Sequence, residues 1–369
     1  MFLHCIIITF VFQIYTMKNI YFFLGLIFLF SSCKKDLTNT ITPDTSVTPY
    51  ILIPPLRFPQ PYISYINPLT VEGIALGRRL FYDQILSSNF RSCSYCHPQE
   101  LSFTSSIAEH GLDTTQYWDI LPWINLAWKP FYGWNGGIKE MDHIGIADLG
   151  PKYLNSNMTE VLAKLKADST YSAMFKKAFN GEDVLVPDKI QEKIAFAIAQ
   201  FAKTIVSSNS KFDKYLMGTA QLTPQEANGY DIFYSEKGDC FHCHGTILLT
   251  DNGRHNIGLD TVFNNKYNQG YFTASGLAKD MGLMMTPTLR NVAQTSPYMH
   301  DGRYKTLEEV IEHYNSGVHK SPTLDPIMTL PSKEMGLLLS NSQKADLKAF
   351  LLTFTDSTLL FNPQFSRPK

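Results

Sequence analysis

Residues 91–98, "RSCSYCHP", determine the expected fold, because they set two cysteines three positions apart with a histidine directly behind them. The same arrangement returns in residues 238–245, "GDCFHCHG". A Cys-x-x-Cys-His segment is the attachment signature of c-type haem, in which both thiols bond to the haem and the histidine binds its iron. The sequence therefore predicts two covalently bound haems. Their attachment and ligand residues are Cys93, Cys96, His97, Cys240, Cys243 and His244.

The four cysteines could also form disulfides or bind zinc. A disulfide inside each Cys-x-x-Cys pair would close too small a loop to stabilise a fold of 369 residues. Four thiolates could instead bind one zinc ion, and this alternative stays open. The histidine behind both pairs favours haem, because zinc needs no histidine once four thiolates are present.

A weak internal repeat surrounds the two motifs. Residues 77–82, "GRRLFY", precede the first motif, and residues 229–234, "GYDIFY", precede the second. Between the motifs, residues 190–201 place apolar side chains at steps of three and four, which is typical of an amphipathic helix. No stretch alternates like a strand. The predicted fold class is mainly α, with two cytochrome c-like helical domains that each bind one haem.

The N-terminus has the features of an export signal. From Met17 the chain shows a basic Lys18, an apolar run over residues 20–30, two serines and then Cys33. The run is too short for a membrane-spanning helix and is typical of a signal peptide. Cys33 after small residues resembles the lipobox of bacterial lipoproteins, which implies a lipid on its thiol and a periplasmic protein anchored to a membrane. A plain cleaved signal with an incidental cysteine is the alternative.

The domain boundaries follow from these features. We expect residues 1–33 to be the signal peptide, with the true start at Met17 and residues 1–16 an upstream artefact. The remaining predicted segments are a flexible tether rich in Thr and Pro (34–60), an N-terminal haem domain (61–210), a C-terminal cytochrome c domain (211–357) and a tail (358–369). The formal charge of −1 and the lack of a long Lys/Arg block argue against a nucleic-acid partner.

Longer stretches resemble a known family. Residues 286–317, "TPTLRNVAQTSPYMHDGRYKTLEEVIEHYNSG", closely resemble the C-terminal half of bacterial dihaem cytochrome c peroxidases and MauG-type proteins. Residues 75–104 and 125–137 resemble the first domain of the same family, and the resemblance covers roughly residues 62–355. It implies that hydrogen peroxide reacts at the N-terminal haem and that the C-terminal haem passes electrons. The donor would be a small redox protein or an oxidisable residue of a partner protein, and many relatives form homodimers.

The second ligand of the C-terminal haem separates the two branches of the family. At the position where the peroxidases place Met, this chain has Tyr314, the residue type of MauG-type proteins. Thr306 and Glu309 predict a capping box that starts a helix, whose apolar face would include Tyr314. His313 lies off this face, so we expect it to face solvent. The alternatives are that Tyr314 is a packed core aromatic and that the ligand is a methionine of the preceding loop, namely Met281, Met284 or Met285.

The resemblance implies roles for further residues. Trp134 matches a tryptophan between the two haems, and His300 matches a histidine close to them. His110 matches a displaceable ligand of the N-terminal haem, or is a plain loop residue. A calcium ion between the domains is implied at Asp119, Thr295 and Pro297.

One position departs from the family. The glutamate that moves protons during peroxide cleavage is replaced by Asn157, and an amide cannot exchange a proton at neutral pH. Asp148 or His143 could take its place from nearby. The departure leaves a second function open, a dihaem electron-transfer or redox-sensing lipoprotein without a catalytic site.

Overall fold

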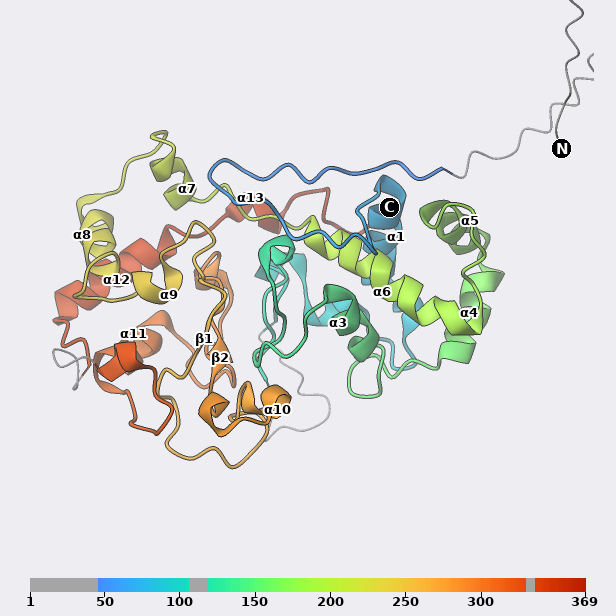
Figure 1. Ribbon diagram of the computed structural model, residues 1–369. Coiled ribbons are helices and arrows are strands. Elements are labelled where there is room, and N and C mark those ends of the chain that lie inside the picture. Colours follow the sequence, from blue (N-terminus) through green and yellow to red (C-terminus); the bar gives the residue numbers. More distant parts are fainter. Residues whose placement is uncertain (1–45, 106–117, 330–335) are drawn as a thin grey trace, which may run out of the picture. The chain divides into compact units, whose positions relative to one another are not determined.

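The computed structural model describes residues 46–105, 118–329 and 336–369 (Figure 1). Cys33, the signal peptide and His110 fall outside the described residues. Within them the only strands are β1 (Arg254–His255) and β2 (Met284–Met285), which pair antiparallel. The predicted mainly α class is therefore confirmed. No helix in the described ranges is both long and apolar enough to cross a membrane.

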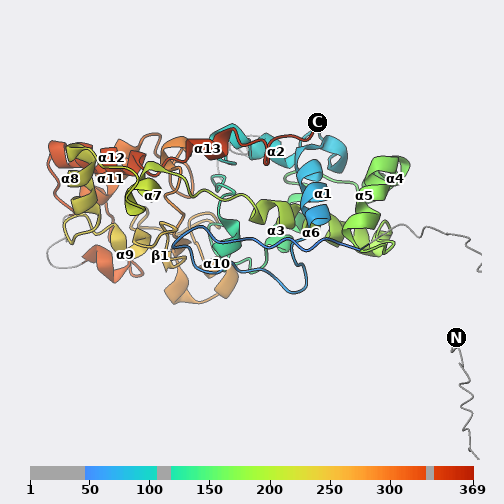
Figure 2. The same ribbon diagram turned by 90° about the horizontal axis from the view of Figure 1, so that it is seen from above.

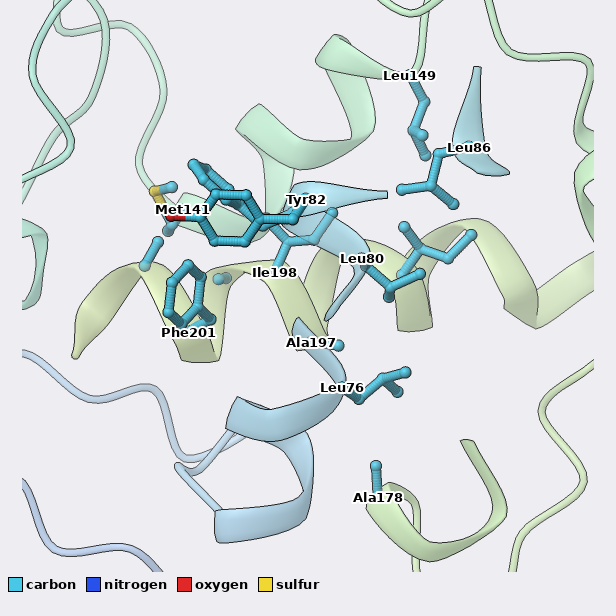
Figure 3. Close-up of a cluster of buried hydrophobic side chains, with 14 of the residues drawn as sticks. Leu76, Leu80, Tyr82, Leu86, Met141, Leu149, Ala178, Ala197, Ile198 and Phe201 are labelled. Carbon is cyan, nitrogen blue, oxygen red and sulfur yellow. The ribbon is translucent and has the colours of Figure 1, made fainter. Parts of the chain in front are cut away.

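The N-terminal half is built around α6, whose apolar face was predicted from the spacing of its residues. Its helices are α1 (Val71–Tyr82), α2 (Cys93–Cys96), α3 (Met141–Asp148), α4 (Met158–Ala167), α5 (Ser169–Ala178) and α6 (Pro187–Lys203). Side chains of α1 and α6 meet in one apolar core, in which Leu76, Ala197 and Phe201 are fully buried (Figure 3). This core holds the segment that carries the first haem motif, because Cys93 packs against it.

The C-terminal half has a separate apolar core. Its helices are α7 (Lys211–Leu216), α8 (Pro224–Phe233), α9 (Phe241–His244), α10 (Phe272–Ser275), α11 (Leu307–Ser316), α12 (Asn341–Leu352) and α13 (Ser357–Leu360). Phe233 of α8 and Phe350 of α12 meet edge to face at 5.4 Å, and Cys240 packs against the same cluster.

Short 3-10 helices lie between the α-helices of both halves. They are η1 (Gln84–Leu86), η2 (Gln99–Leu101), η3 (Leu126–Trp128), η4 (Ala278–Asp280), η5 (Val292–Gln294) and η6 (Pro326–Thr329).

The glycine of the sequence repeat marks the closest helix crossing in each half. A Cβ on Gly77 of α1 would lie 1.8 Å from the carbonyl oxygen of Ala197 on α6. A Cβ on Gly229 of α8 would lie 2.0 Å from the carbonyl oxygen of Asp346 on α12. The repeated sequence therefore forms the same kind of helix pair in each half. Glycine is required where the two helix backbones are in contact.

The predicted flexible tether is shorter than expected. Residues 46–60 lie against the folded chain, with the ring of Phe58 edge-on to Trp128 at 5.3 Å. The indole N–H of Trp128 donates to the carbonyl of Pro59 (2.7 Å). Apolar side chains within the Thr/Pro-rich segment bury against Trp128, and composition alone does not reveal such a contact.

The predicted C-terminal tail returns to the N-terminal half. Both views place the C-terminus beside α1 (Figures 1 and 2). The hydroxyl of Tyr82 donates to the carbonyl of Phe365 (2.7 Å), and Arg78 donates to the carbonyls of Pro363 and Ser366 (2.6 Å each). Phe365 is 8% exposed and belongs to the core of the N-terminal half. Residues 358–369 thus complete a core that begins almost 300 residues earlier in the sequence.

Candidate functional site

The first haem motif presents its histidine in the form that binds a metal. Cys93 and Cys96 lie on the single turn of α2, and His97 ends that turn. The Nδ1 of His97 lies 2.7 Å from the carbonyl oxygen of Phe103, which can only accept, so Nδ1 carries the proton and Nε2 keeps its lone pair. Burial lowers the pKa of His97 to about 4, so the ring is neutral. The ring packs against Trp123 in a tilted arrangement, with the ring centroids 4.4 Å apart, which limits its movement.

The second motif repeats this geometry. His244 ends α9, and its Nδ1 lies 2.8 Å from the carbonyl oxygen of Leu249. Burial also lowers the pKa of His244. In both halves the chain turns back five or six residues after the histidine and offers a carbonyl, which orients the ring and leaves Nε2 for an iron.

The cysteines do not form the four-thiolate zinc site. Cys93 packs against the N-terminal core and Cys240 against the C-terminal core, so the two pairs belong to separate clusters. None of the four forms a disulfide in the described part of the chain. Burial raises the pKa of Cys93 and raises that of Cys240 to about 12, which favours thiols over the thiolates that zinc requires. A pair of cysteines beside a neutral histidine fits covalent haem.

A cavity in the C-terminal half brings His244 and Tyr314 together. Both line it, and its wall is mostly apolar, as a porphyrin ring requires. The other apolar residues in that wall include Phe233, Leu289, Val292, Leu307, Ile311 and Leu351. Burial raises the pKa of Tyr314. Met284 and Met285 also line the cavity, whereas Met281 does not, so iron ligation by Tyr314 stays a prediction with these two methionines as alternatives.

His313 does not face solvent, and that prediction was wrong. The residue is 3% exposed, and its Nε2 donates to the carbonyl of Ile257 (3.0 Å). The segment after β1 covers this side of α11, so the helix is buried on more than its apolar stripe. Tyr304 then donates a long hydrogen bond (3.4 Å) to the Nδ1 of His313, which keeps the imidazole neutral in its site.

Trp134 and His300 meet on the cavity wall. Their rings lie 6.5 Å apart in an edge-to-face arrangement, and both residues are buried. The indole N–H of Trp134 donates to the carbonyl of Asp119 (2.7 Å). The Nδ1 of His300 is buried and has no hydrogen-bond partner among the described residues, and burial lowers its pKa. A buried polar atom without a partner at a cavity wall is what a bound group would satisfy.

The three predicted calcium ligands are brought to the same region. Asp119, Thr295 and Pro297 all line the cavity, and the backbone N–H of Asp119 donates to the carbonyl of His300 (2.7 Å). Pro297 and Asp119 flank Gly302, where an added Cβ would lie 3.0 Å and 3.7 Å from them. Calcium binding itself stays a prediction.

Asn157 lies at the surface as a helix cap. It is exposed, and its side-chain oxygen accepts from the backbone N–H groups of Thr159 (3.1 Å) and Glu160 (3.3 Å) at the start of α4. Asparagine is a favoured cap residue, so the fold accounts for it without an appeal to catalysis. His143 is exposed as well. A catalytic role for Asn157 stays a prediction that the geometry does not favour.

Sequence reasoning missed a charged cluster on the cavity wall. The Nδ1 of His255 lies 2.6 Å from Asp325, and its Nε2 lies 2.9 Å from Asp251. Both ring nitrogens therefore donate, and the pKa of His255 rises to about 11, first through the hydrogen bond to Asp251. Asp251 and His255 are four positions apart, but Asp325 is 70 residues away, so no local pattern could have revealed the cluster.

Comparisons with known proteins agree with this geometry. The family model for di-haem cytochrome c peroxidase matches residues 71–221. The methylamine utilization protein MauG of Methylorubrum extorquens is 31% identical over 296 residues, which span 78% of this chain and 79% of that protein. The cytochrome c551 peroxidase of Nitrosomonas europaea is 30% identical over 257 residues, 68% of this chain and 75% of that protein.

Solved structures show the same fold. A MauG-like protein associated with microbial copper homeostasis has a TM-score of 0.77 and 32% identity, and the match covers 86% of this chain and 99% of that one. The diheme peroxidase BthA from Burkholderia thailandensis has a TM-score of 0.68 at 20% identity, a likeness of fold that covers 88% of this chain and 100% of that one.

Proposed function

Because the chain belongs to the di-haem cytochrome c peroxidase and MauG family, we propose that it is an exported enzyme that reduces hydrogen peroxide with two electrons. The observation that carries the proposal is the meeting of His244 and Tyr314 in one cavity, with Trp134 on its wall. A plain peroxidase needs electrons from a small redox protein. A phenolate ligand suits a different donor, an oxidisable side chain of a partner protein.

The chain's own residues would hold both haems. Four thiols, two in each half, would attach them, and the Nε2 atoms of His97 and His244 would bind the irons. Carbonyls of Phe103 and Leu249 fix the two imidazoles in one tautomer. When bound, the haems supply the redox chemistry of peroxide cleavage. Trp134, held by Asp119 and packed on His300, lies where an electron vacancy could pass between the two halves.

The ligand type sets the direction of electron flow. A phenolate oxygen is a hard, anionic donor that stabilises oxidised iron, whereas a thioether raises the reduction potential. With Tyr314 as ligand, the C-terminal haem accepts electrons poorly from ordinary cytochromes. It is suited to oxidising a side chain of a partner protein.

We also propose a membrane anchor, a calcium site and a displaceable haem ligand. A lipid on Cys33 would hold the mature enzyme at a bacterial membrane, in the periplasm. Calcium would bind Asp119, Thr295 and Pro297 between the halves, and His110 would be a displaceable ligand of the N-terminal haem.

The test measures haem and turnover in one preparation. A pyridine haemochrome spectrum should show two c-type haems per chain, and a single haem or none would overturn the proposal. Peroxide should then be consumed in the presence of reduced cytochrome c or of an oxidisable protein. The second candidate, a non-catalytic electron carrier, is favoured by Asn157 at the usual glutamate position. It predicts two haems that cycle between oxidation states without consuming peroxide.

A further inference from the structure

Two segments of the chain repeat one local structure. Asn125 and Asn291 both adopt the left-handed conformation (φ 54° and 58°), and a 3-10 helix follows each at once. The backbone N–H of Asn125 donates to Ile205, two residues after α6, and that of Asn291 donates to Phe354, two residues after α12. Each side-chain oxygen accepts a backbone N–H four residues beyond the same helix, at 2.7 Å.

The repeat continues without an insertion into the next helix. Tyr132 pairs with Ile138 in one segment, and Tyr298 pairs with Tyr304 in the other. Trp134 and His300 each stand two residues after the first tyrosine of their pair. Three residues after the second partner, α3 begins at Met141 and α11 at Leu307.

Residues can therefore be matched one for one between α3 and α11. The eighth residue of α11 is Tyr314, and the eighth residue of α3 is Asp148. Both side chains act on the haem motif of their own half. The pKa of Tyr314 is raised by burial and next by Cys243, and the pKa of Cys93 is raised by burial and next by Asp148. Each helix thus ends over its own Cys-x-x-Cys-His.

Length distinguishes the two side chains. A tyrosine hydroxyl extends roughly 3 Å further from its Cα than an aspartate carboxyl does. If Tyr314 reaches an iron bound by His244, the shorter Asp148 would not reach an iron bound by His97. The shorter side chain would leave space there for a molecule the size of peroxide.

We propose that Asp148, rather than Asn157, is the acid–base residue at the N-terminal haem, an inference that rests on the proposed peroxide reduction. The carboxylate of Asp148 takes the proton from one peroxide oxygen and returns it to the other, which leaves as water when the O–O bond breaks. Two electrons from the donor and two protons from solvent complete the reduction of one peroxide to two water molecules. Asp148 ends the cycle in the protonation state in which it began.

The surroundings of Asp148 suit this exchange. Its carboxylate has no hydrogen-bond partner in the ranges that the structure describes, so no donor locks it in the ionised form. Burial raises its pKa to about 7, and the charge of Lys152 opposes the rise. A carboxyl with a pKa near neutrality can both take and give a proton, the requirement for a general acid–base group. The exposed Asn157 lacks both the burial and the ionisable group.

The test uses cyanide and peroxide on the holoenzyme. Hydrogen cyanide must lose its proton to bind ferric iron, so a base at the N-terminal haem speeds its association. The wild-type rate should rise from pH 5.5 to pH 8 along a single ionisation near pH 7. Asp148→Asn should lower the rates with cyanide and with peroxide by about 100-fold and flatten both pH profiles. Asp148→Glu should restore part of each rate, and Asn157→Ala should change neither.

The outcomes separate the inference from the proposed function. Unchanged cyanide and peroxide rates in Asp148→Asn, or their loss in Asn157→Ala, would overturn it. If Asp148→Asn fails to retain haem, the wild-type profile decides, because a flat cyanide rate across this pH range leaves no role for the carboxyl. A wild-type enzyme that binds cyanide with the expected profile but consumes no peroxide would refute the proposed function and keep Asp148 as the base.

Discussion

Tyr314 is the single side chain that most affects the chemistry of the molecule. It shares a cavity with His244, and burial raises its pKa, so as a free residue it would be a neutral phenol. Coordination to ferric iron would remove that proton, because a metal ion stabilises the phenolate. The residue therefore has a role only together with the haem.

Replacing Tyr314 by Phe tests the ligand. The ring still fills its place beside Leu307 and Ile311, but the oxygen is gone, so one haem should change from low-spin to high-spin. Electron paramagnetic resonance of the ferric protein measures this change, and Tyr314→Met should instead raise the potential of that haem. An unaltered spectrum in Tyr314→Phe would assign the ligand to Met284 or Met285.

Asn157 should matter for stability and little for turnover. Removal of its cap by Asn157→Ala should destabilise the protein by about 1 kcal/mol, because two backbone N–H groups of α4 lose their acceptor. Chemical denaturation of the holoprotein measures the loss. Thr159→Ala, in the same exposed turn, is the matched control and should cost less. A large drop in peroxide turnover with intact stability would restore Asn157 to the active site.

At the residue scale, the spacing of nearby residues predicted the haem motifs. It did not predict features that depend on contacts between distant parts of the sequence. His97 and His244 follow from the Cys-x-x-Cys-His pattern, and the shared cavity of His244 and Tyr314 agrees with the helical register of Tyr314. The burial of His313 and the hydrogen bond between His255 and Asp325 depend on segments far away in the sequence. No pattern around either histidine distinguishes it from a surface residue.

Among the elements, the two helix pairs depend on their glycines. Gly77→Ala and Gly229→Ala should each destabilise the protein by several kcal/mol, because the new methyl group would overlap a carbonyl oxygen of the facing helix. Thermal unfolding followed at the haem absorption bands should show a lower midpoint for both. An alanine tolerated at either position would mean that the helices separate easily there.

The His255 cluster should make stability depend on pH. The pKa of His255 in the folded protein, about 11, lies above its ordinary value of 6.5, so its contribution is complete below pH 6.5 and is lost as pH rises towards 11. The pKa of Asp251 falls to about 2, so its contribution is lost only in strong acid. His255→Gln should therefore lower the free energy of unfolding more at pH 6 than at pH 9. Equal losses at both pH values would show that His255 is not charged in the fold.

Elements with a local signal were predicted well. The capping box of Thr306 and Glu309 starts α11, and the apolar stripe of α6 is buried, both as expected. The packing of residues 46–60 was not predicted, because a segment rich in Thr and Pro has the composition of a linker. Its apolar residues find their partner, Trp128, only in the folded protein.

At the scale of the whole molecule, the C-terminal end of the described chain contributes to the core of the N-terminal half. The mainly α class and the family resemblance were confirmed, and the division into residues 61–210 and 211–357 stays a prediction. The return of the C-terminus to α1 was not predictable, since residues 358–369 show no periodic pattern. Contacts in the folded protein, such as those of Phe365 and Arg78, reveal it.

Phe365→Ala tests this contribution. The side chain lies in the N-terminal core, so its loss should cost about 3 kcal/mol and expose that core. Hydrogen exchange should then increase in α1, far away in the sequence. Phe361→Ala is the control, because Phe361 is 74% exposed. Equal effects of the two variants would mean that the last residues only rest on the surface.

The position of Phe365 also determines when, during synthesis of the chain, the N-terminal core can be completed. A chain synthesised from its N-terminus presents the first haem motif long before the residues that complete the surrounding core. Until the last residues are made, the domain around the first haem motif has an incomplete core, open on the side that those residues later cover. A stop codon directly after α13 would spare both haem motifs and every helix of the described chain, yet the damage would fall on the half of the protein that was made first.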